Sequence, residues 1–282
     1  MFNTFLSRMK KLCQAIVVNC ILVLFASTSF CQAIISGKVK NKQGEALSYA
    51  NIGIKGGKIG TVSTVGGDFT ISIPDSLAND SLTFSSIGYH DKSYIINSLR
   101  VKNDVVIVLD EKITSLAEVK INNVKRKQYK LGITGRTPMM FIPTKSYQQN
   151  DILEQARLIQ LKKPAKIINA NIFVLSESTK EVSIRLNFYA LENGLPGRRI
   201  VEKTIIRKAP IKKGWFSIDL KEEDVYLDED FVISFEYLPS EQRAVVFAAK
   251  IGAANSFVRS SSLGIWRKNQ AAGCSIYVTA EQ

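Results

Sequence analysis

The stretch "TVSTVGGDFTISIP", residues 61–74, decides the fold class of this 282-residue chain. A Gly66-Gly67-Asp68 turn leads into residues 69–73, where Phe, Ile and Ile alternate with Thr and Ser. Alternation with period two predicts a β-strand with one buried face. A phosphate-binding loop would instead open a helix and carry a Lys-Ser/Thr pair, and neither feature follows here. We therefore predict a β-hairpin, in which glycine supplies the positive φ of a tight turn.

Short strands separated by turn signals continue through residues 34–110, without a helical period of useful length. The segment "KSYIINS" (92–98) is predicted as one of these strands, and "VVIVL" (105–109) as the last. Many short strands at regular spacing are typical of an all-β sandwich.

Three segments of this region resemble the carboxypeptidase-regulatory-like domain. They are "ISGKVKNKQGEALSYANIGIKGGKIGTVSTVGGDFTISIP" (35–74), "LTFSSIGYHDKSYII" (82–96) and "VVIVL" (105–109). The resemblance implies a seven-stranded, transthyretin/Ig-like β-sandwich that lacks the catalytic apparatus of the metallocarboxypeptidases it accompanies. It is also similar to the extension at the N-terminus of TonB-dependent outer-membrane receptors. That similarity implies an accessory module in the periplasm or at the cell surface.

Residues 1–33 have the order of a secretory signal peptide. A positively charged start precedes the apolar run "AIVVNCILVLFA" (15–26), and the segment ends at Ala33. The run is short for a membrane span, which needs about 20 apolar residues. We expect cleavage on export to the periplasm, the outer-membrane surface or the extracellular space. Retention as an N-terminal anchor is the alternative. Lipid attachment at Cys31 is disfavoured by the bulky Phe30 before it.

The cysteine content and the charge of the chain limit the classes of function that it can have. Cleavage would leave Cys274 alone among the four cysteines, which excludes an intrachain disulfide and a thiolate metal cluster. The signal carries three positive charges and residues 34–110 one (eight Lys/Arg against seven Asp/Glu), so +9 of the total +13 lies in residues 111–282. Outside the cytoplasm, such a surface meets anionic lipid or acidic glycan rather than nucleic acid; a merely solvated surface is the alternative.

Residues 111–130 are predicted to be a basic linker. The segment "SLAEVKINNVKRK" within it is similar to the one that follows this module in outer-membrane receptors. However, only 152 residues remain after residue 130, too few for the receptors' 22-stranded barrel. Leu116–Val124 has two interpretations, an edge strand that pairs with a partner or a plain interdomain connection.

Residues 131–282 are predicted to form a second β-sandwich. Segment 156–162 and the run "RRIVEKTIIRK" (198–208) are two of about eight expected strands, and the turn Glu192-Asn193-Gly194 separates two others. The pattern "GLPG…KKGWFSIDL…LDEDFVISFEYL…SSSLGIWRK…CSIYVTAE" resembles jelly-roll modules of secreted bacterial proteins.

The residues of the sequence give little support for catalytic chemistry. His90 is the one histidine and is expected in a surface turn, which disfavours a Ser-His-Asp triad. A zinc site that needs two or more histidines is disfavoured for the same reason. The acidic stretch "LKEEDVYLDED" (220–230) has three interpretations: a solvated connection, a calcium loop or a carboxylate pair. We predict no catalytic residue, no cofactor and no metal.

Trp266 and Trp215 are the candidate ligand-binding residues, because flat indole rings can stack against sugars. Trp266 lies in a polar hairpin expected to be exposed. Trp215 opens an alternating strand, where packing at the core or its rim is the alternative role. The sequence thus predicts an exported, non-catalytic binding or assembly protein of the bacterial cell envelope, whose partner is an envelope protein or a glycan. The alternative is a carbohydrate-binding accessory protein that acts through the C-terminal sandwich. For either function, peripheral contact with the outer-membrane surface is a further expected interaction.

Overall fold

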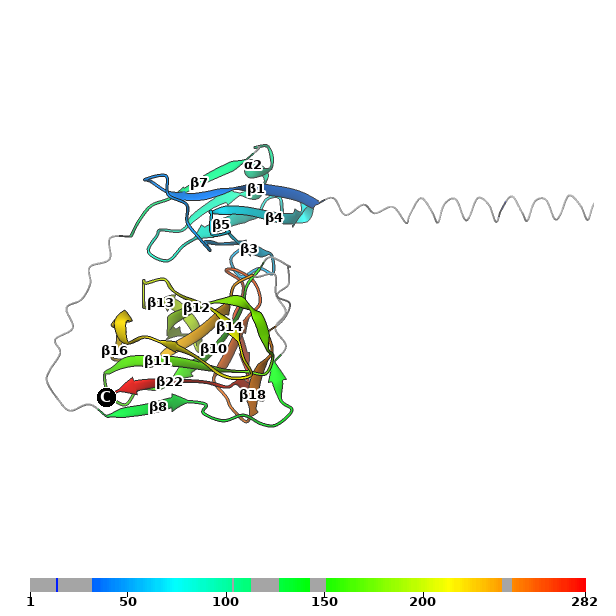
Figure 1. The fold of residues 1–282 in the computed structure, drawn as a ribbon. Coiled ribbons are helices and arrows are strands. Elements are labelled where there is room, and N and C mark those ends of the chain that lie inside the picture. The colour runs from blue at the N-terminus through cyan, green and yellow to red at the C-terminus, as the bar shows by residue number, and fades with distance from the viewer. Residues whose placement is uncertain (1–13, 15–31, 103, 113–126, 143–150, 240–244) are drawn as a thin grey trace, which may run out of the picture.

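The computed structural model describes residue 14 and residues 32–102, 104–112, 127–142, 151–239 and 245–282. These residues form an almost entirely β protein, which confirms the predicted fold class (Figure 1). The predicted signal segment, 1–33, lies outside the described residues apart from Gln14, Gln32 and Ala33, and Leu116–Val124 lies outside them completely. Within the described residues, no helix has the length and apolar character needed to cross a membrane.

The N-terminal sandwich contains seven strands in two sheets, as the resemblance implies. One sheet has the order β4-β1-β7, with β1 (Gln32–Asn41) antiparallel to β4 (Asp68–Pro74) and parallel to β7 (Val105–Leu109). The other has the order β3-β2-β5-β6, formed by β3 (Gly60–Val62), β2 (Asn51–Gly53), β5 (Ser81–Ser85) and β6 (Lys92–Ile95). The predicted alternation is confirmed, because Phe69, Ile71 and Ile73 are all buried between the sheets.

The glycine turn of the opening stretch is present, but the predicted hairpin is wrong. Gly67 has a φ of 81° and its N–H donates to the Thr64 carbonyl at 3.0 Å. The strands on either side, β3 and β4, belong to different sheets. The turn therefore carries the chain from one layer of the sandwich to the other. Glycine is needed twice over, since a Cβ at position 67 would also lie 2.6 Å from the Val39 carbonyl oxygen.

The predicted strand 92–98 is only half correct. β6 ends at Ile95, and the short helix α2 (Ile96–Arg100) follows. Ile96 and Leu99, three residues apart, are both buried, so a helical turn places both in the core. This helix is part of the crossover that the parallel pairing of β7 with β1 requires.

The C-terminal sandwich has two sheets with a shared apolar core. We name them the inner and the outer sheet. The inner sheet has the order β13-β12-β17-β10-β19-β20, with β14 also paired to β12. Its strands are β10 (Leu153–Ile159), β12 (Ser178–Glu192), β13 (Leu195–Arg199), β14 (Ile205–Ile211), β17 (Phe231–Tyr237), β19 (Ser256–Arg259) and β20 (Arg267–Asn269).

The outer sheet has the order β21-β18-β11-β22-β8, with β15 and β16 also paired to β11 and β9 to β18. Its strands are β8 (Gln128–Gly132), β9 (Phe141–Ile142), β11 (Ala165–Val174), β15 (Gly214–Asp219), β16 (Tyr226–Leu227), β18 (Phe247–Ile251), β21 (Ala272–Cys274) and β22 (Ile276–Glu281). From β10 onward the chain crosses repeatedly between the two sheets, as in a jelly roll. The core between them contains Ile184, Phe188, Phe235, Ile172 and Val278.

Three boundaries in this half differ from the prediction. β10 ends at Ile159, so the predicted strand 156–162 starts too late and ends too late. The run 198–208 is not one strand, since it contains the end of β13 and the start of β14. Both strands pair with the 15-residue β12, which is long enough for two partners along one edge. The linker predicted for 111–130 ends before Gln128, where β8 begins to pair with β22.

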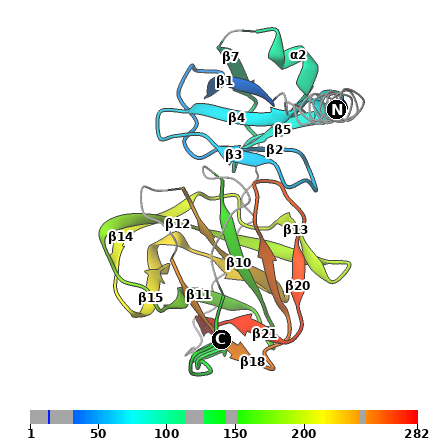
Figure 2. The ribbon, with the colours of Figure 1, turned by 90° about the vertical axis from the view of Figure 1, so that its right-hand side faces the viewer.

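The layers are stacked in a fixed order. Figures 1 and 2 show the N-terminal sandwich on the inner sheet, with the strands β11 and β22 of the outer sheet on the far side. The outer sheet therefore presents one face to the shared core and the other away from the N-terminal sandwich.

Candidate functional site

Aromatic side chains gather on the solvent face of the outer sheet. Core residues Ile172 and Val174 flank Phe173 in β11, so alternation turns Phe173 to the opposite face. The same argument places Trp215 of β15 and Tyr277 of β22 outward. All three rings are partly exposed. Because these strands are neighbours, residues far apart in the chain meet on one face.

Trp215 contacts each of the other two rings edge to face. The Trp215 ring centroid lies 5.2 Å from that of Phe173 and 4.7 Å from that of Tyr277, with interplanar angles of 78° and 80°. Such T-shaped pairs are a favoured aromatic geometry. We name Phe173, Trp215 and Tyr277 the aromatic platform.

The platform closes over the middle of β11. Tyr277 is registered opposite Asn171, and Trp215 comes from the strand on the other side of β11. Asn171 is only 3% exposed. Its amide donates to the Asn169 side chain at 2.7 Å and to the Tyr277 carbonyl at 3.4 Å. The Asn171 side chain thus ties the backbone of Tyr277 to β11.

Two cations flank the platform. The Arg136 guanidinium lies 5.2 Å from the Phe173 ring centroid, and Lys130 Nζ lies 5.5 Å from that of Tyr277. Both side chains are exposed. The surface therefore offers apolar ring faces beside positive charge.

Trp266 lies elsewhere, on the inner sheet, and is partly exposed, as Trp215 is. Its ring is partly buried on the inner sheet, 5.6 Å from the Tyr189 ring centroid and 4.6 Å from the Arg259 guanidinium. The indole covers a buried ionic cluster. The structure therefore does not bring Trp266 and Trp215 together. Both indoles are partly exposed and both stay candidates: Trp215 packs against two other aromatic rings, and Trp266 packs against Tyr189 and Arg259.

The ionic cluster beneath Trp266 fills the face of the inner sheet that points toward the N-terminal sandwich. Glu154 accepts from Arg259 Nε at 2.9 Å and from the Tyr189 hydroxyl at 2.9 Å, and it also accepts from the Ser234 hydroxyl. The Asn187 amide joins the two carboxylates, donating to Glu154 at 2.9 Å and to Glu236 at 2.8 Å. We name this set, together with Arg185, the buried ionic network. Glu154 and Glu236 are 0% exposed.

Burial and pairing shift the proton affinities within the network. Burial opposes ionisation of Glu236, but the Arg185 guanidinium outweighs it and holds the pKa at about 2. Burial, reinforced by the negative charge of Glu154, raises the pKa of Tyr189 to about 12. A carboxylate with a lowered pKa cannot act as a general acid near neutral pH. The network therefore has the properties of a structural ion cluster.

Arg185 extends the network into the N-terminal sandwich. Its Nε and Nη2 form a bidentate pair with Glu236, both at 2.7 Å. Its Nη1 donates to the Tyr49 carbonyl and its Nη2 to Asn51 Oδ1, again at 2.7 Å each. Tyr49 adopts a φ of 54°, a region that non-glycine residues rarely occupy. One buried guanidinium thus ties the two sandwiches together.

A glycine-rich hairpin makes the second connection. The Gly56 N–H donates to the Leu263 carbonyl at 2.9 Å, and the Ser261 hydroxyl donates to the Gly57 carbonyl at 3.0 Å. A Cβ on Gly60 would lie 2.9 Å from Asp151 Oδ2. Burial raises the pKa of Asp151 to about 6 despite two backbone N–H donors, Ser262 and Ile152. The "GGKIG" segment is therefore a docking surface between the sandwiches as well as a turn.

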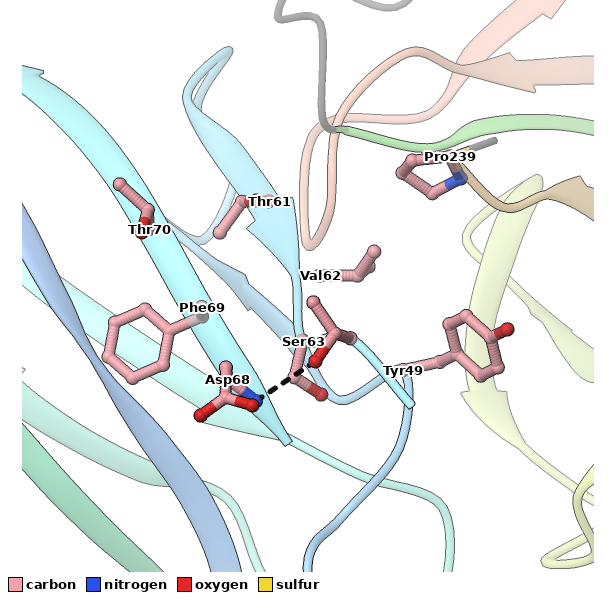
Figure 3. Close-up of a pocket in the computed structure, with 9 residues that line it drawn as sticks. Tyr49, Thr61, Val62, Ser63, Asp68, Phe69, Thr70 and Pro239 are labelled. Carbon is pink, nitrogen blue, oxygen red and sulfur yellow. Dashed lines mark hydrogen bonds between the residues drawn. The ribbon is translucent and has the colours of Figure 1, made fainter. Parts of the chain in front are cut away.

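A cavity of about 290 Å³ lies at the same boundary. It is lined by β3 and β4 together with Tyr49 and Pro239, which Figure 3 shows on the opposite side from Phe69 and Thr70. The Asp68 N–H donates to Thr64 Oγ1 at 3.2 Å at its rim. Among the described residues, its walls carry hydroxyls and the Asp68 carboxylate.

The other sequence candidates have structural partners. In the acidic stretch, Glu223 hydrogen-bonds Lys203 and Arg207, which lowers its pKa, and Asp224 pairs with Lys166 at 2.6 Å. His90 is an exposed turn residue. Within the described ranges, no group of three or more His, Cys, Asp or Glu side chains is arranged to hold a metal ion.

Comparison with protein families now decides the identity of the N-terminal part. The family model of the CarboxypepD_reg-like domain matches residues 35–133. The chain contains a carboxypeptidase-regulatory-like domain. The match covers all of the N-terminal sandwich after the start of β1 and extends into β8, which pairs with β22 of the outer sheet. The carboxypeptidase-regulatory-like domain is thus joined to the outer sheet through its own C-terminal extension.

Comparison with the curated proteins gives no match. Among solved structures, the Clostridial cysteine protease Cwp84 after propeptide cleavage is similar at a TM-score of 0.39 and 9% identity, over 89% of this chain and 65% of that chain. The cysteine protease and lectin-like domains of Cwp84, a surface layer associated protein of Clostridium difficile, give 0.38 and 8%, over 89% and 58%. This chain therefore spans less than two thirds of either. Likeness at this level carries no inference about function.

Sequence reasoning missed most of the residues around Trp215. Phe173 and Tyr277 each sit at an outward position of an alternating strand, which was a usable signal. Their meeting with Trp215 depends on the strand order β15-β11-β22, which the sequence does not reveal. Lys130 falls within the predicted linker, although it lies in β8.

Proposed function

We propose that this chain is an exported, non-catalytic binding protein of the bacterial envelope that binds a saccharide on the aromatic platform. The observation that carries the proposal is the cluster of Phe173, Trp215 and Tyr277 on the solvent face of the outer sheet. Partly exposed aromatic clusters of this kind mark binding surfaces. A sugar ring has an apolar C–H face, which gains free energy when it covers an aromatic ring at about 25 cal/mol per Å².

The platform is suited to recognition because its rings are already fixed. Each ring packs on another, and Asn171 ties the backbone beneath them. Fixed side chains lose little conformational entropy when a ligand binds. The position of the platform, on the side of the protein away from the carboxypeptidase-regulatory-like domain, leaves room for an extended polymer (Figure 1).

The carboxylates support binding rather than hydrolysis. A glycosidase needs two carboxyl groups, one of them protonated near neutral pH, on either side of an accessible bond. Glu154 and Glu236 are fully buried, and both are paired with guanidinium groups. Export is proposed from the character of residues 1–33, which is that of a signal peptide.

A second candidate function is assembly with an envelope protein through the carboxypeptidase-regulatory-like domain. Ile34 of β1 is 70% exposed and Val106 of β7 is 59% exposed, and β7 is at the edge of its sheet. Edge strands with exposed apolar residues are sites where other chains add. Co-purification of an envelope protein with the wild type but not with a Val106→Lys variant would support this function.

A glycan array tests the saccharide proposal. The full chain lacking the predicted signal is compared with Trp215→Ala and with Tyr129→Ala as a matched control. Tyr129 is 46% exposed on β8 but outside the platform. We expect binding to at least one saccharide, a loss of tenfold or more in Trp215→Ala, and no change in Tyr129→Ala. Absence of saccharide binding by the wild type, or equal binding by both variants, would contradict the proposal.

A further inference from the structure

The charged side chains around the aromatic platform indicate the chemical class of its ligand. Resting on the proposed function, we infer that the saccharide is anionic, with a carboxylate or a phosphate on a sugar unit beside the ring that stacks. The inference depends on two cations, Arg136 and Lys130, and on the acids that surround them.

Arg136 is held at the platform by the backbone on either side of it. The preceding Gly135 carbonyl accepts from the Ser275 hydroxyl at 2.9 Å, and the following Thr137 N–H donates to the Ala249 carbonyl at 2.9 Å. A segment that is hydrogen-bonded on both sides of Arg136 therefore holds its guanidinium over the Phe173 ring. A guanidinium that stacks on a ring keeps its N–H groups in one plane, ready for the two oxygens of a carboxylate or phosphate.

Lys130 lies beside a second ring of the platform, that of Tyr277. It lies in β8, opposite Thr279 in a strand pair that runs from Gln128 to Gly132. Its Nζ lies 5.5 Å from the Tyr277 ring centroid. The sequence β15-β11-β22-β8 places four neighbouring strands under this surface, which at about 4.8 Å per strand spacing is about 14 Å wide. On this surface Lys130 lies beside Tyr277 of β22, and Arg136 lies beside Phe173 of β11.

Across the described part of the chain, Arg136 and Lys130 contact aromatic rings and neither forms an ion pair with a carboxylate. The carboxylates of the same sheet are already engaged: Glu281 accepts from Gln128 at 2.9 Å, and Asp219 accepts from the Lys221 N–H at 3.0 Å. Exposed Lys212 and Lys213 lie just before Trp215 in the chain and add positive charge. A neutral sugar would leave this charge unused, whereas an anionic one complements it.

Polygalacturonate and its fully methyl-esterified form make a matched pair of probes, because the ester removes the charge and keeps the sugar ring. A phosphomannan and its dephosphorylated form make the second pair. Each is titrated against the full chain lacking the predicted signal, with affinity electrophoresis at two salt concentrations. The variants are Lys130→Gln/Arg136→Gln and Trp215→Ala. The control Lys162→Gln/Lys163→Gln removes two exposed charges at the start of β11, about 30 Å along the strand from Phe173.

We expect at least one charged polymer to bind tenfold or more tightly than its uncharged form. The double variant Lys130→Gln/Arg136→Gln is expected to reduce that ratio to nearly one, and the control to leave it unchanged. The pair that shows the ratio tells whether the carboxylate or the phosphate is the preferred anion. Equal binding of charged and uncharged forms overturns the inference and leaves the proposed function standing. The inference is also overturned if Trp215→Ala still binds the charged polymer. It is overturned as well if the control variant lowers the affinity for the charged polymer as much as Lys130→Gln/Arg136→Gln does, since the attraction would then be unspecific. If no saccharide binds here or on the array, the proposed function itself fails.

Discussion

Arg185→Met tests how the two sandwiches are held together. Arg185 donates four hydrogen bonds of 2.7 Å, two to Glu236 and one each to Tyr49 and Asn51. Methionine keeps much of the apolar stem and removes every donor. Glu236 would then stay fully buried with the Asn187 amide as its one remaining close donor among the described residues. Removing one partner of a buried ion pair costs about 3–5 kcal/mol.

The assay is thermal and urea unfolding of the full chain lacking the predicted signal, followed by circular dichroism. For a chain of this size about 3–5 kcal/mol corresponds to a fall of about 6–20 °C in the melting temperature. The double variant Arg185→Met/Glu236→Leu removes both charges and should recover most of the loss, since an apolar replacement of a buried pair is often neutral. Recovery should be incomplete, because the Tyr49 carbonyl and the Asn51 side chain lose a donor. A single variant that costs less than about 1 kcal/mol, or a double variant as unstable as the single, would refute this reasoning.

Three further outcomes follow from the same boundary and from the core. Gly53→Ala should destabilise the protein by about 1–3 kcal/mol in urea unfolding, because its Cβ would clash with the Ser262 carbonyl oxygen; the control Gly135→Ala, whose Cβ would meet no atom within 4 Å, should be milder. Asp151 has a folded pKa of about 6 against 3.8 unfolded, so its contribution to stability is fully present below pH 4 and is lost as the pH rises through 6. The free energy of unfolding of Asp151→Asn should therefore rise by up to about 3 kcal/mol relative to that of the wild type between pH 4 and pH 7. A difference in unfolding free energy between the two proteins that does not change with pH would contradict this. Cys274 is fully buried, which raises its thiol pKa, so a thiol reagent should label the native chain only after denaturant is added, and rapid native labelling would count against the core assignment.

The strand content was predictable because alternation in the sequence reports which residues share a face. Residues 69–73 show this directly, since each predicted inward residue is buried. Alternation does not report which strands pair. For that reason the sequence predicts a hairpin at Gly67, although the turn joins two sheets. Helix α2 was missed because five residues are too few to establish a helical period.

The buried ionic network was not predictable for a related physical reason. Arg185 and Glu236 occupy the polar positions of alternating strands, and such positions ordinarily face water. Here the carboxypeptidase-regulatory-like domain covers them. Burial by a second domain does not change the alternation of apolar and polar residues along a strand, so the sequence does not reveal it. The platform was found only in part, since Trp215 stands out by residue type whereas Phe173 and Tyr277 become partners only through strand order.

The most direct test of the central claim uses Trp215 as its own reporter. The chain has two tryptophans, so Trp266→Phe leaves Trp215 as the sole indole. Its emission is recorded during titration with the saccharide that the wild type binds, alongside an independent measurement of binding. The account predicts a saturable change in intensity or wavelength with the same midpoint as binding. Binding that leaves the Trp215 emission unchanged would place the ligand elsewhere and contradict the assignment of the aromatic platform.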